Sequence, residues 1–371
     1  MHRLIVCASV PTMDGRVRMN KLKEVFLNNG IEFLFWGWRR EKTEYTTEYP
    51  LKHLWTGGGY ANKGLLFHYP FWIMSVFFNA LKLKKSDKVY AVAFDVALPI
   101  YLASKIKGFD YIFDNPDNFS LTYNLKGVTK RFIDNLEKKI AKNALYHIVP
   151  DRSRVNEIDE KTVVIPNFPL TSELEKAKVI FKEGKLDDID IAQLKDDKRL
   201  KIYINGRMVK QRGSEWIAKT IEKLDPDKFL FIVAGNVLCD TLNDTIKKSK
   251  NVVKFSRMEN YKALSLYFCS DLVFAFYDPA LPINKKAAPN KWWDCVACGV
   301  PFVTNDGIET AKEFVEKEAC FQLPYGSDRL VDLLKELERN KEEIEIKKNN
   351  LKNFETYNWE HQILKIIKEI T

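Results

Sequence analysis

The chain has few of the residues that would identify a metal, disulfide or membrane-spanning protein. Its 371 residues include six cysteines and five histidines, too scattered for a disulfide scaffold or for paired metal ligands. Cys295 and Cys298 form a Cys-x-x-Cys pair without a second pair, and we interpret both as buried helix residues. No uninterrupted apolar run reaches about 18 residues, which argues against a transmembrane helix.

The beginning of the chain has none of the marks of a signal peptide. The first residues, MHRLIVCASV, contain an apolar run of strand length but no small-residue cleavage site after it. With the sparse cysteines, this indicates a reducing compartment, so we expect a cytoplasmic protein. The composition, 46% hydrophobic and 29% charged, is that of a globular protein long enough for two domains.

Positive charge is concentrated in the first half of the chain. The formal net charge is +9, and residues 1–165 hold 25 Lys+Arg against 17 Asp+Glu. A basic half of this kind can bind nucleic acid, an anionic membrane surface or an anionic substrate, or it is a basic surface without a dedicated partner. No helix-turn-helix, zinc-finger or RNA-recognition motif accompanies it, so we expect no nucleic-acid partner.

Strand-like and helical segments alternate along the chain, which predicts an α/β protein with parallel sheets covered on both faces. The first half alternates strand candidates with helical stretches such as 17–28, 97–107 and 129–143. The second half repeats the pattern with helices at 214–224 and 290–298. The predicted strands are Leu4–Ala8, Ile31–Phe35, Val89–Phe94, Tyr111–Phe113, Tyr146–Val149, Leu200–Ile204, Phe229–Ala234, Val252–Phe255, Leu272–Phe276 and Pro301–Thr304.

These segments predict two doubly wound, Rossmann-like domains with a ligand cleft between them. The first domain is expected at 1–168 and the second at 200–355. Residues 169–199 are charged and poor in strand formers, so we interpret them as a linker that includes an irregular helix. A last helix in 356–371 is expected to cross back onto the first domain.

The most informative loop is Asn205–Gly213, NGRMVKQRG, between a strand and a helix. A helix N-terminus there favours phosphate, and Arg207, Lys210 and Arg212 add positive charge beside Gly206. A second segment, Pro289–Pro301, begins a helix near Asn290. It places Lys291 and Asp294 three residues apart on one helix face, where the carboxylate could accept ribose hydroxyls.

A third loop, VPTMDGRVR, follows the first strand and could bring Gly15, Arg16 and Arg18 to the cleft from the other domain. Residues 64–85, GLLFHYPFWIMSVFFNALKLKK, are apolar with a basic end. This segment is either an unusually apolar core helix or an interfacial segment on an anionic membrane surface. The charge asymmetry favours peripheral attachment to the inner face of the cell membrane.

Together, these motifs resemble the glycosyltransferases of the GT-B fold, specifically glycosyltransferase family four. Asn205–Gly213 looks like the family's GRLxxxKG loop, with Arg207 at its Arg and Arg212 at its Lys. Pro289–Pro301 is similar to its PxKxxExmAcGxPvv segment. Further matches are Val163–Phe168 (VVIPNF), Ser270–Phe274 (SDLVF), PTMDGRVR with Trp36–Arg40 (WGWRR), Phe113–Asp117 (FDNPD) and Asn358-Trp359.

The chain departs from that family at its pair of glutamates. The second glutamate is Asp294 here, and Lys286 stands where the first would be. The intervening segment, Tyr277–Ala288, is longer and more polar than in the family. In the family the first glutamate lies near the transferred sugar and the second holds the ribose, so the resemblance leaves the sugar and the mechanism open.

The resemblance implies a nucleotide-sugar donor site in the second domain. Arg207 and Arg212 would neutralise the diphosphate, with fixed cations in place of a metal, so that no metal or other cofactor is required. Asp294 would hold the ribose, and the backbone at Arg257 and Met258 would contact the base. The candidates for catalytic and acceptor-side carboxylates are Asp95, Asp114 and Asp117.

The expected activity is sugar transfer, with retention, from a nucleotide sugar to a hydroxyl of a glycan in surface polysaccharide biosynthesis. A lipid-linked glycan is one candidate acceptor. Two alternatives remain open: a GT-B sugar-nucleotide epimerase, and a non-catalytic glycosyltransferase-like partner subunit, which the absence of the first glutamate would explain.

Overall fold

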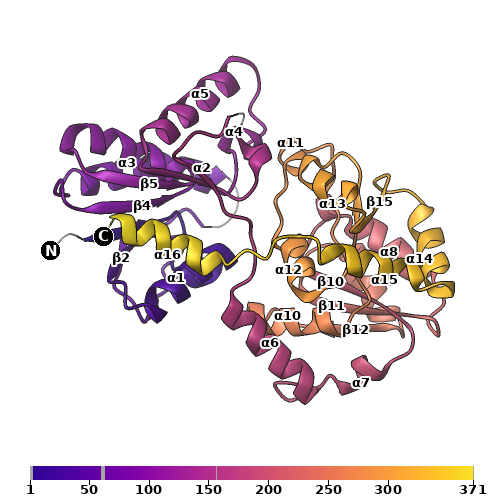
Figure 1. Cartoon of the computed structure of the whole chain (residues 1–371). Helices are drawn as coiled ribbons and strands as arrows, with labels where there is room; N and C mark the ends of the chain where they lie inside the picture. Colours follow the sequence, from indigo (N-terminus) through magenta and orange to yellow (C-terminus); the bar gives the residue numbers. More distant parts are fainter. Residues whose placement is uncertain (1–2, 60–62, 156, 371) are drawn as a thin grey trace. The chain divides into compact units, whose positions relative to one another are not determined.

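The protein consists of two compact α/β units (Figure 1). In this computed structural model, the first unit comprises Met1–Pro166 and Trp359–Thr371, and the second comprises Asn167–Asn358. The structure describes residues 3–59, 63–155 and 157–370. Each unit has its own parallel sheet with helices on both faces, as the alternating segments predict.

The first unit contains seven parallel strands in the order β3-β2-β1-β4-β5-β6-β7. β3 was not expected from the sequence, because it is a half-exposed edge strand that mixes polar and apolar residues. β2 also runs further than expected, to Arg39. The strands are β1 Leu4–Cys7, β2 Phe33–Arg39, β3 Leu51–Thr56, β4 Lys88–Val92, β5 Asp110–Asp114, β6 Tyr146–Val149 and β7 Thr162–Val164.

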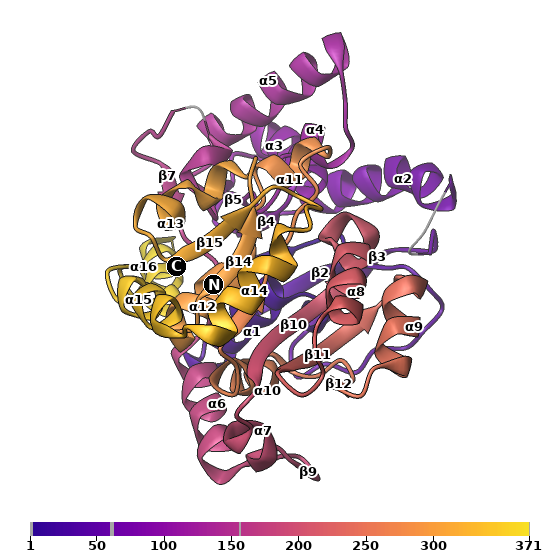
Figure 2. The same ribbon diagram turned by 90° about the vertical axis from the view of Figure 1, so that its right-hand side faces the viewer.

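The helices of the first unit form two layers (Figures 1 and 2). Right-handed crossovers place the helices that follow β3, β4 and β5 on one face and the helix that follows β1 on the other. The helices are α1 Val17–Asn28, α2 Lys63–Ala80, α3 Phe94–Lys107, α4 Phe119–Thr122, α5 Gly127–Asn143 and the C-terminal α16 Trp359–Ile370, with single 3-10 turns η1 Met13–Gly15 and η2 Arg152–Arg154.

The C-terminal helix packs on the first unit, as predicted. α16 lies beside α1 (Figure 1), and the Lys21 ammonium sits 4.6 Å from the centroid of the Trp359 ring. Trp359, Ile363 and Ile367 are buried on its inner side. The apolar side of α16 therefore packs on the first unit and not on the second unit, which directly precedes it in the sequence.

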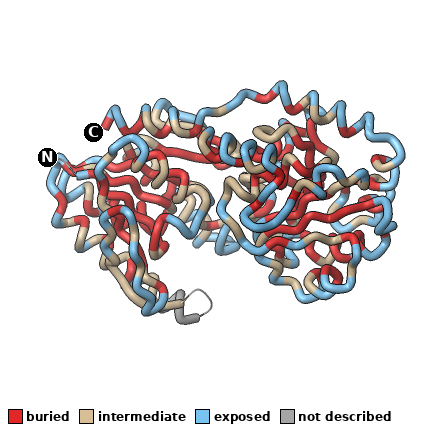
Figure 3. Tube along the Cα trace, turned by 90° about the horizontal axis from the view of Figure 1, so that it is seen from below, coloured by how far each residue is buried: buried red, intermediate tan, exposed pale blue. Residues whose placement is uncertain are grey.

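The second unit contains six parallel strands in the order β12-β11-β10-β13-β14-β15. Residues of β10 alternate between its two core clusters: Ile202 and Ile204 face one, and Tyr203 faces the other. Figure 3 shows the buried stretches along the strands. The strands are β10 Leu200–Met208, β11 Phe229–Val237, β12 Val252–Phe255, β13 Leu272–Phe274, β14 Phe302–Asn305 and β15 Cys320–Leu323.

Helices cover both faces of this sheet and bury the two core clusters. Trp216 and Leu334 belong to one cluster, and Leu264 and Trp292 belong to the other. The helices are α6 Thr171–Glu183, α7 Ala192–Asp196, α8 Ser214–Lys223, α9 Asp240–Lys248, α10 Asn260–Phe268, α11 Pro282–Lys285, α12 Asn290–Cys298, α13 Lys312–Glu316, α14 Arg329–Arg339 and α15 Glu342–Leu351, with 3-10 turns η3 Lys210–Arg212 and η4 Glu309–Ala311.

Residues 169–199 are not a linker but part of the second unit. They form α6, α7 and a small antiparallel pair, β8 Lys185–Leu186 with β9 Ile189–Asp190. Ala177, Leu186 and Ile191 are buried in the core of that unit. The sequence conceals this because single apolar residues are spread among many charged ones.

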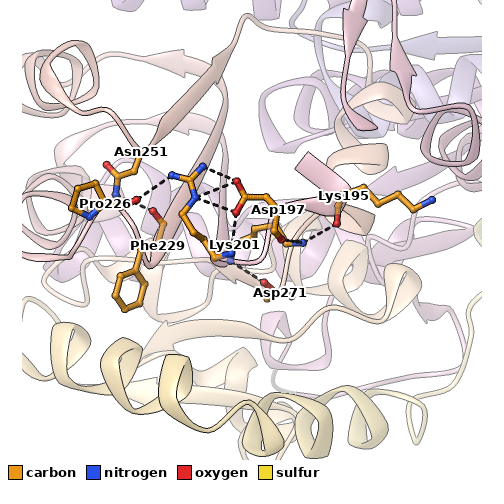
Figure 4. Close-up of polar contacts among 8 residues, drawn as sticks. Lys195, Asp197, Lys201, Pro226, Phe229, Asn251 and Asp271 are labelled. Atoms are coloured by element: carbon orange, nitrogen blue, oxygen red, sulfur yellow. Dashed lines mark hydrogen bonds and ion pairs between the residues drawn. The ribbon is translucent and has the colours of Figure 1, made fainter. Parts of the chain in front are cut away.

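Polar contacts fasten the end of this segment to the amino end of the second sheet (Figure 4). Arg199 pairs with Asp197 and donates from Nη1 to the Pro226 carbonyl oxygen at 3.0 Å. The Lys201 backbone N–H donates to Asp271 Oδ2 at 2.8 Å. The amino end of this sheet is therefore occupied by the protein's own polar groups, so the carboxyl end is the one that we consider for a ligand.

Candidate functional site

The second sheet has a topological switch point at its centre, between β10 and β13. The chain leaves β10 towards β11 on one side and leaves β13 towards β14 on the other. Helices that begin beyond the carboxyl ends of two such strands diverge to opposite faces, which opens a crevice for a ligand. Most of the donor-side residues predicted from the sequence lie at this edge.

A pair of glycines brings two backbones together at this edge. The strand β10 runs to Met208, not to Ile204, because Gly206 still pairs with Gly235 of β11. A Cβ atom on Gly235 would lie 2.3 Å from the Gly206 carbonyl oxygen. Both glycines have a positive φ, 84° at Gly206 and 122° at Gly235. The first part of the predicted loop is therefore strand, and its backbone is exposed at Gly206, which has no side chain.

The cations of the motif follow directly. Arg207 is exposed near the end of β10, where it pairs with Asn236 of β11. Lys210–Arg212 form the turn η3 before α8. Gly213 has φ 71°, and a Cβ there would lie 3.0 Å from Phe276 Cβ. The Arg212 guanidinium carbon lies 4.3 Å from the centroid of the buried Tyr277 ring, so this cation rests on a fixed aromatic face.

Lys291, at the start of α12, lies beside the same glycines. Its Cε is 3.8 Å from the point where a Cβ of Gly206 would be. Burial, and secondarily the charge of Arg212, lowers the pKa of Lys291 to about 7. Arg207, Arg212 and Lys291 make no ion pair with a carboxylate among the residues that the structure describes. The carboxyl end of the sheet therefore presents two arginines and one lysine that form no ion pair with a described carboxylate.

Asp294, one turn further along α12, is buried, at 5% exposure. Tyr267 donates its hydroxyl to Asp294 Oδ2 at 3.3 Å, and Asn205 Nδ2 donates to the Tyr267 oxygen at 2.9 Å. Asn205 Oδ1 is buried with no hydrogen-bond partner in the described part of the chain. Tyr267 was missed from the sequence because its proximity is produced only by the packing of α10 on α12.

The other predicted donor-side residues also lie at or near this edge. Arg257 and Met258 follow β12; Arg257 is exposed, whereas Met258 packs on the core. Lys286 is the half-buried C-cap of the short helix α11. The Asp278 backbone N–H donates to the Gln211 carbonyl oxygen at 3.0 Å, so the segment that replaces the family's glutamate turn brings a different carboxyl-bearing residue beside η3.

The first unit has its own switch point, between β1 and β4. Gly15 and Arg16 are exposed after β1, and Asp95 lies at the start of α3 after β4. The residue that joins β4 to α3, Ala93, has φ 72° and ψ 161°, a conformation that is costly for any residue with a Cβ atom. Such local strain is typical of functional sites.

Asp95 is a buried carboxylate with an unused oxygen. It is 5% exposed, and its Oδ2 has no hydrogen-bond partner within the described ranges. Burial raises the pKa of Asp95, and the Ser9 hydroxyl and the charges of Arg16 and Arg40 oppose that rise. A ligand hydroxyl would supply the missing donor.

Arg40 was missed as a site residue, although it stands in the WGWRR motif. Its guanidinium carbon lies 3.5 Å from the Trp38 ring centroid, and Nη2 donates to the Ser9 carbonyl oxygen at 2.9 Å. Nη1 is buried with no partner among the described residues, and burial lowers the pKa of Arg40. Asp95 and Arg40 thus offer one unsatisfied acceptor and one unsatisfied donor at the same edge.

Arg18 and Asp114 bind each other. Arg18 Nε donates to both Asp114 oxygens, at 3.0 and 2.9 Å, and Tyr90 donates its hydroxyl to Asp114 Oδ2 at 2.9 Å. Asp114 is 1% exposed. A carboxylate held by a guanidinium and a phenol is a poor base, so this geometry favours a structural role for both residues.

Asp117 is exposed and pairs with the buried Arg154 at 3.1 Å. Of the three carboxylates proposed from the sequence, Asp95 alone combines deep burial with an unsatisfied oxygen. The described residues hold no cluster of three or more His, Cys, Asp or Glu side chains that could hold a metal ion. No helix in the described part of the chain is long and apolar enough to cross a membrane.

Neither a protein-family model nor any curated protein sequence matches the chain. Solved structures match it over its whole length. The chain is similar to sucrose-phosphate synthase from Thermosynechococcus elongatus, with 11% identity, a TM-score of 0.70, and coverage of 100% of this chain and 99% of that one. It is also similar to HepE from Anabaena in complex with UDP and glucose, with 14% identity, a TM-score of 0.66, and coverage of 99% and 100%.

A third similar structure is the UDP-forming α,α-trehalose-phosphate synthase from Burkholderia vietnamiensis, with 11% identity, a TM-score of 0.66, and coverage of 100% and 99%. At these identities the likeness establishes the fold. The chain has the GT-B fold, with two Rossmann-like domains and a last helix that returns to the first.

Proposed function

We propose that this protein is a glycosyltransferase that moves a sugar from a nucleotide-sugar donor to a hydroxyl group of a glycan. The observation that carries the proposal is the positive charge of Arg207 and Arg212 beside Gly206 at the switch point of the second sheet, with Lys291 next to them able to take up a proton. The fold adds support, since HepE was solved with UDP-glucose and a trehalose-6-phosphate synthase from E. coli with UDP-2-fluoro glucose.

In this proposal the second unit binds the donor. Arg207 and Arg212 bind the diphosphate and stabilise the charge that develops on it as it leaves, without a metal ion. Lys291 takes up a proton when the diphosphate approaches. Asp294, positioned by Tyr267 and Asn205, accepts the ribose hydroxyls, and the backbone at Arg257 and Met258 contacts the base.

The first unit binds the acceptor. Asp95 accepts a hydrogen bond from the acceptor hydroxyl and orients it, and Arg40 donates to a neighbouring acceptor oxygen. Arg16, exposed at the same edge, adds a cation there. The resemblance to glycosyltransferase family four favours retention of anomeric configuration and a role in surface polysaccharide biosynthesis, with a lipid-linked glycan as a candidate acceptor.

One observation favours a second candidate, a non-catalytic partner subunit. Lys286 stands at the place of a glutamate that the resembling family keeps near the transferred sugar. Asp278 is a carboxyl-bearing residue in the same segment, but its Oδ1 accepts from the Ala280 backbone N–H at 2.9 Å, so it does not replace that glutamate.

Calorimetry with UDP, GDP, ADP and CDP tests the donor site. We expect one of the four to bind wild type and to bind Arg212→Ala and Asp294→Ala much more weakly. Lys248→Ala is the matched control, because Lys248 is an exposed lysine at the end of α9 that leads away from this edge. Hydrolysis of the corresponding nucleotide sugars then separates a transferase from a partner subunit. Well-folded protein that binds none of the four nucleotides would refute the donor site.

A further inference from the structure

One helical layer of the first unit exposes large apolar side chains that a stable domain would ordinarily bury. On α2, Phe67 is 68% exposed, Met74 52% and Phe78 55%, and Phe71 is also exposed. Their spacing of four, three and four residues puts them on one side of the helix. The other side of α2 is apolar as well, since Trp72, Val76 and Ala80 are buried against the sheet. A helix that is apolar all round requires a second apolar contact.

The exposed apolar surface continues across the neighbouring helices. α3 packs against α2, and α5 packs against α3, on the same face of the sheet (Figure 1). Leu102 and Ile106 are exposed on α3, and Val128 and Phe132 on α5. We call the exposed surface of α2, α3 and α5 the three-helix face. The sequence indicated only its first helix, because the exposed apolar residues of α3 and α5 belong to segments whose other apolar residues are buried.

The opposite helical layer of the same unit is different. Large apolar side chains are exposed on α2, α3 and α5, but none is exposed on the described residues of α1 and α16. The apolar exposure is therefore a property of one face and not of the unit in general. Exposed apolar side chains gathered on neighbouring helices of one face mark an interaction site.

The three-helix face also carries many exposed cations. The acidic residues of these helices do not offset it, because Asp95 and Glu137 are buried and Asp134 pairs with Lys130. The exposed cations on or directly after the three helices, and before α5, are Lys82, Lys84, Lys85, Lys105, Lys107, Lys126, Arg131, Lys138, Lys139 and Lys142.

We infer that the three-helix face docks on an anionic lipid bilayer, with Phe67, Met74, Phe78, Ile106 and Phe132 in the interfacial layer and the lysines at the headgroups. Apolar side chains that alternate with lysines suit a lipid surface, which offers apolar depth and negative charge together. A second copy of the chain is a poor occupant, because an isologous contact would bring the same lysines together. The docking goes beyond the proposed sugar transfer and does not require it.

Sedimentation with lipid vesicles tests this docking. We expect the wild-type protein to bind vesicles that contain phosphatidylcholine and phosphatidylglycerol in equal parts. It should bind pure phosphatidylcholine vesicles at least about tenfold more weakly, because basic residues are attracted to an anionic surface. Added salt should weaken the binding. Equal binding to both vesicles, or no binding to either, would overturn the inference.

Two pairs of variants locate the contact. Phe78→Ser combined with Phe132→Ser, and Lys84→Glu combined with Lys142→Glu, should each reduce vesicle binding about tenfold or more. Val179→Ser with Leu238→Ser, at comparably exposed apolar positions of the second unit, should leave it unchanged. If both pairs bind like wild type, the face is not the contact.

The same samples separate a bilayer from a second copy. Light scattering should show a monomer for wild type and variants alike, and a dimer that the Phe78→Ser and Phe132→Ser pair dissociates would overturn lipid docking in favour of self-association. Nucleotide binding by these variants should stay at the wild-type level. A failure of vesicle binding is therefore distinguishable from a failure of the donor site.

Discussion

The two units have closely similar sheet topologies but use their charges differently at the switch points. In the first unit, Arg18 pairs with Asp114 and Arg154 with Asp117, and Asp95 and Arg40 each keep one buried polar atom without a partner among the described residues. In the second unit, Arg207, Arg212 and Lys291 gather without a carboxylate ion pair among the described residues. Charges that are paired internally hold the architecture, whereas charges that are left uncompensated indicate a ligand of opposite sign.

The strongest test of this difference is to break the buried pair of the first unit. Arg18→Ala should lower the free energy of unfolding by about 3–5 kcal/mol, because it leaves the buried Asp114 without its cation. Urea unfolding followed by tryptophan fluorescence measures the change. Arg257→Ala, at an exposed arginine of the second unit, should change stability by less than about 0.5 kcal/mol. If Arg18→Ala had the free energy of unfolding of the wild type, Arg18 would not be structural and would again be a candidate binding residue.

A buried carboxyl group makes the stability of the first unit depend on pH. Burial raises the pKa of Glu137 to about 7, although Asn115 Nδ2 donates to its Oε1 at 2.6 Å. The folded pKa exceeds the unfolded one, so its stabilisation is complete below about pH 4.5 and is lost as the pH rises through 7. Glu137→Gln should remove this loss and stabilise the protein at pH 8 by up to about 3 kcal/mol, but not at pH 4. If the free energies of unfolding of Glu137→Gln and of the wild type changed with pH in parallel, the raised pKa of Glu137 would be contradicted.

Substitution of Arg212 should have the opposite consequence from that of Arg18, with affinity lost and stability kept. Arg212→Ala should weaken binding of the nucleotide diphosphate about tenfold to a hundredfold, since charge-assisted hydrogen bonds contribute about 1.5–3 kcal/mol. Arg212→Lys should recover part of the affinity, because it keeps the charge but loses the planar contact with Tyr277. Calorimetry gives the affinity and thermal unfolding the stability. If Arg212→Ala lost much stability and kept its nucleotide affinity, Arg212 would be a structural residue and not a ligand-binding one.

The smallest expected effect is a pH dependence of nucleotide binding. Lys291, with a pKa lowered to about 7, is largely neutral above pH 7 in the free protein. A bound diphosphate favours the charged form, so binding takes up a proton, and the affinity should fall by at most about tenfold per pH unit above pH 7. Lys291→Arg, which keeps its charge, should flatten the slope. A wild-type affinity that is constant from pH 7 to 9 would contradict the role of Lys291.

The sequence predicted the fold well where apolar runs are short and uninterrupted. The central strands β1, β4, β10 and β11 and the return of α16 are confirmed, because each segment buries most of its residues. The edge strand β3 was missed, and residues 169–199 were interpreted as a linker with an irregular helix, since half-exposed elements carry mixed sequences. The extension of β10 to Met208 was missed because Gly206 resembles a turn residue until its pairing with Gly235 is known.

The candidate site was predictable only in part, for a related reason. Motif spacing found Arg207, Arg212, Lys291 and Asp294, whose roles stay predictions. The hydrogen-bond chain through Tyr267 depends on helix packing and leaves no local pattern in the sequence. Arg40 stood in a recognised motif, but its burial on Trp38 was not visible there.

The return of α16 to the first unit also has a consequence for how the protein is made. The ribosome synthesises Met1–Pro166 first, yet the helix that covers α1 emerges only after the whole of Asn167–Asn358 has been translated. Until then, the surface that receives Trp359, Ile363 and Ile367 stays open to solvent and to chaperones. The unit that begins to fold first is therefore completed last.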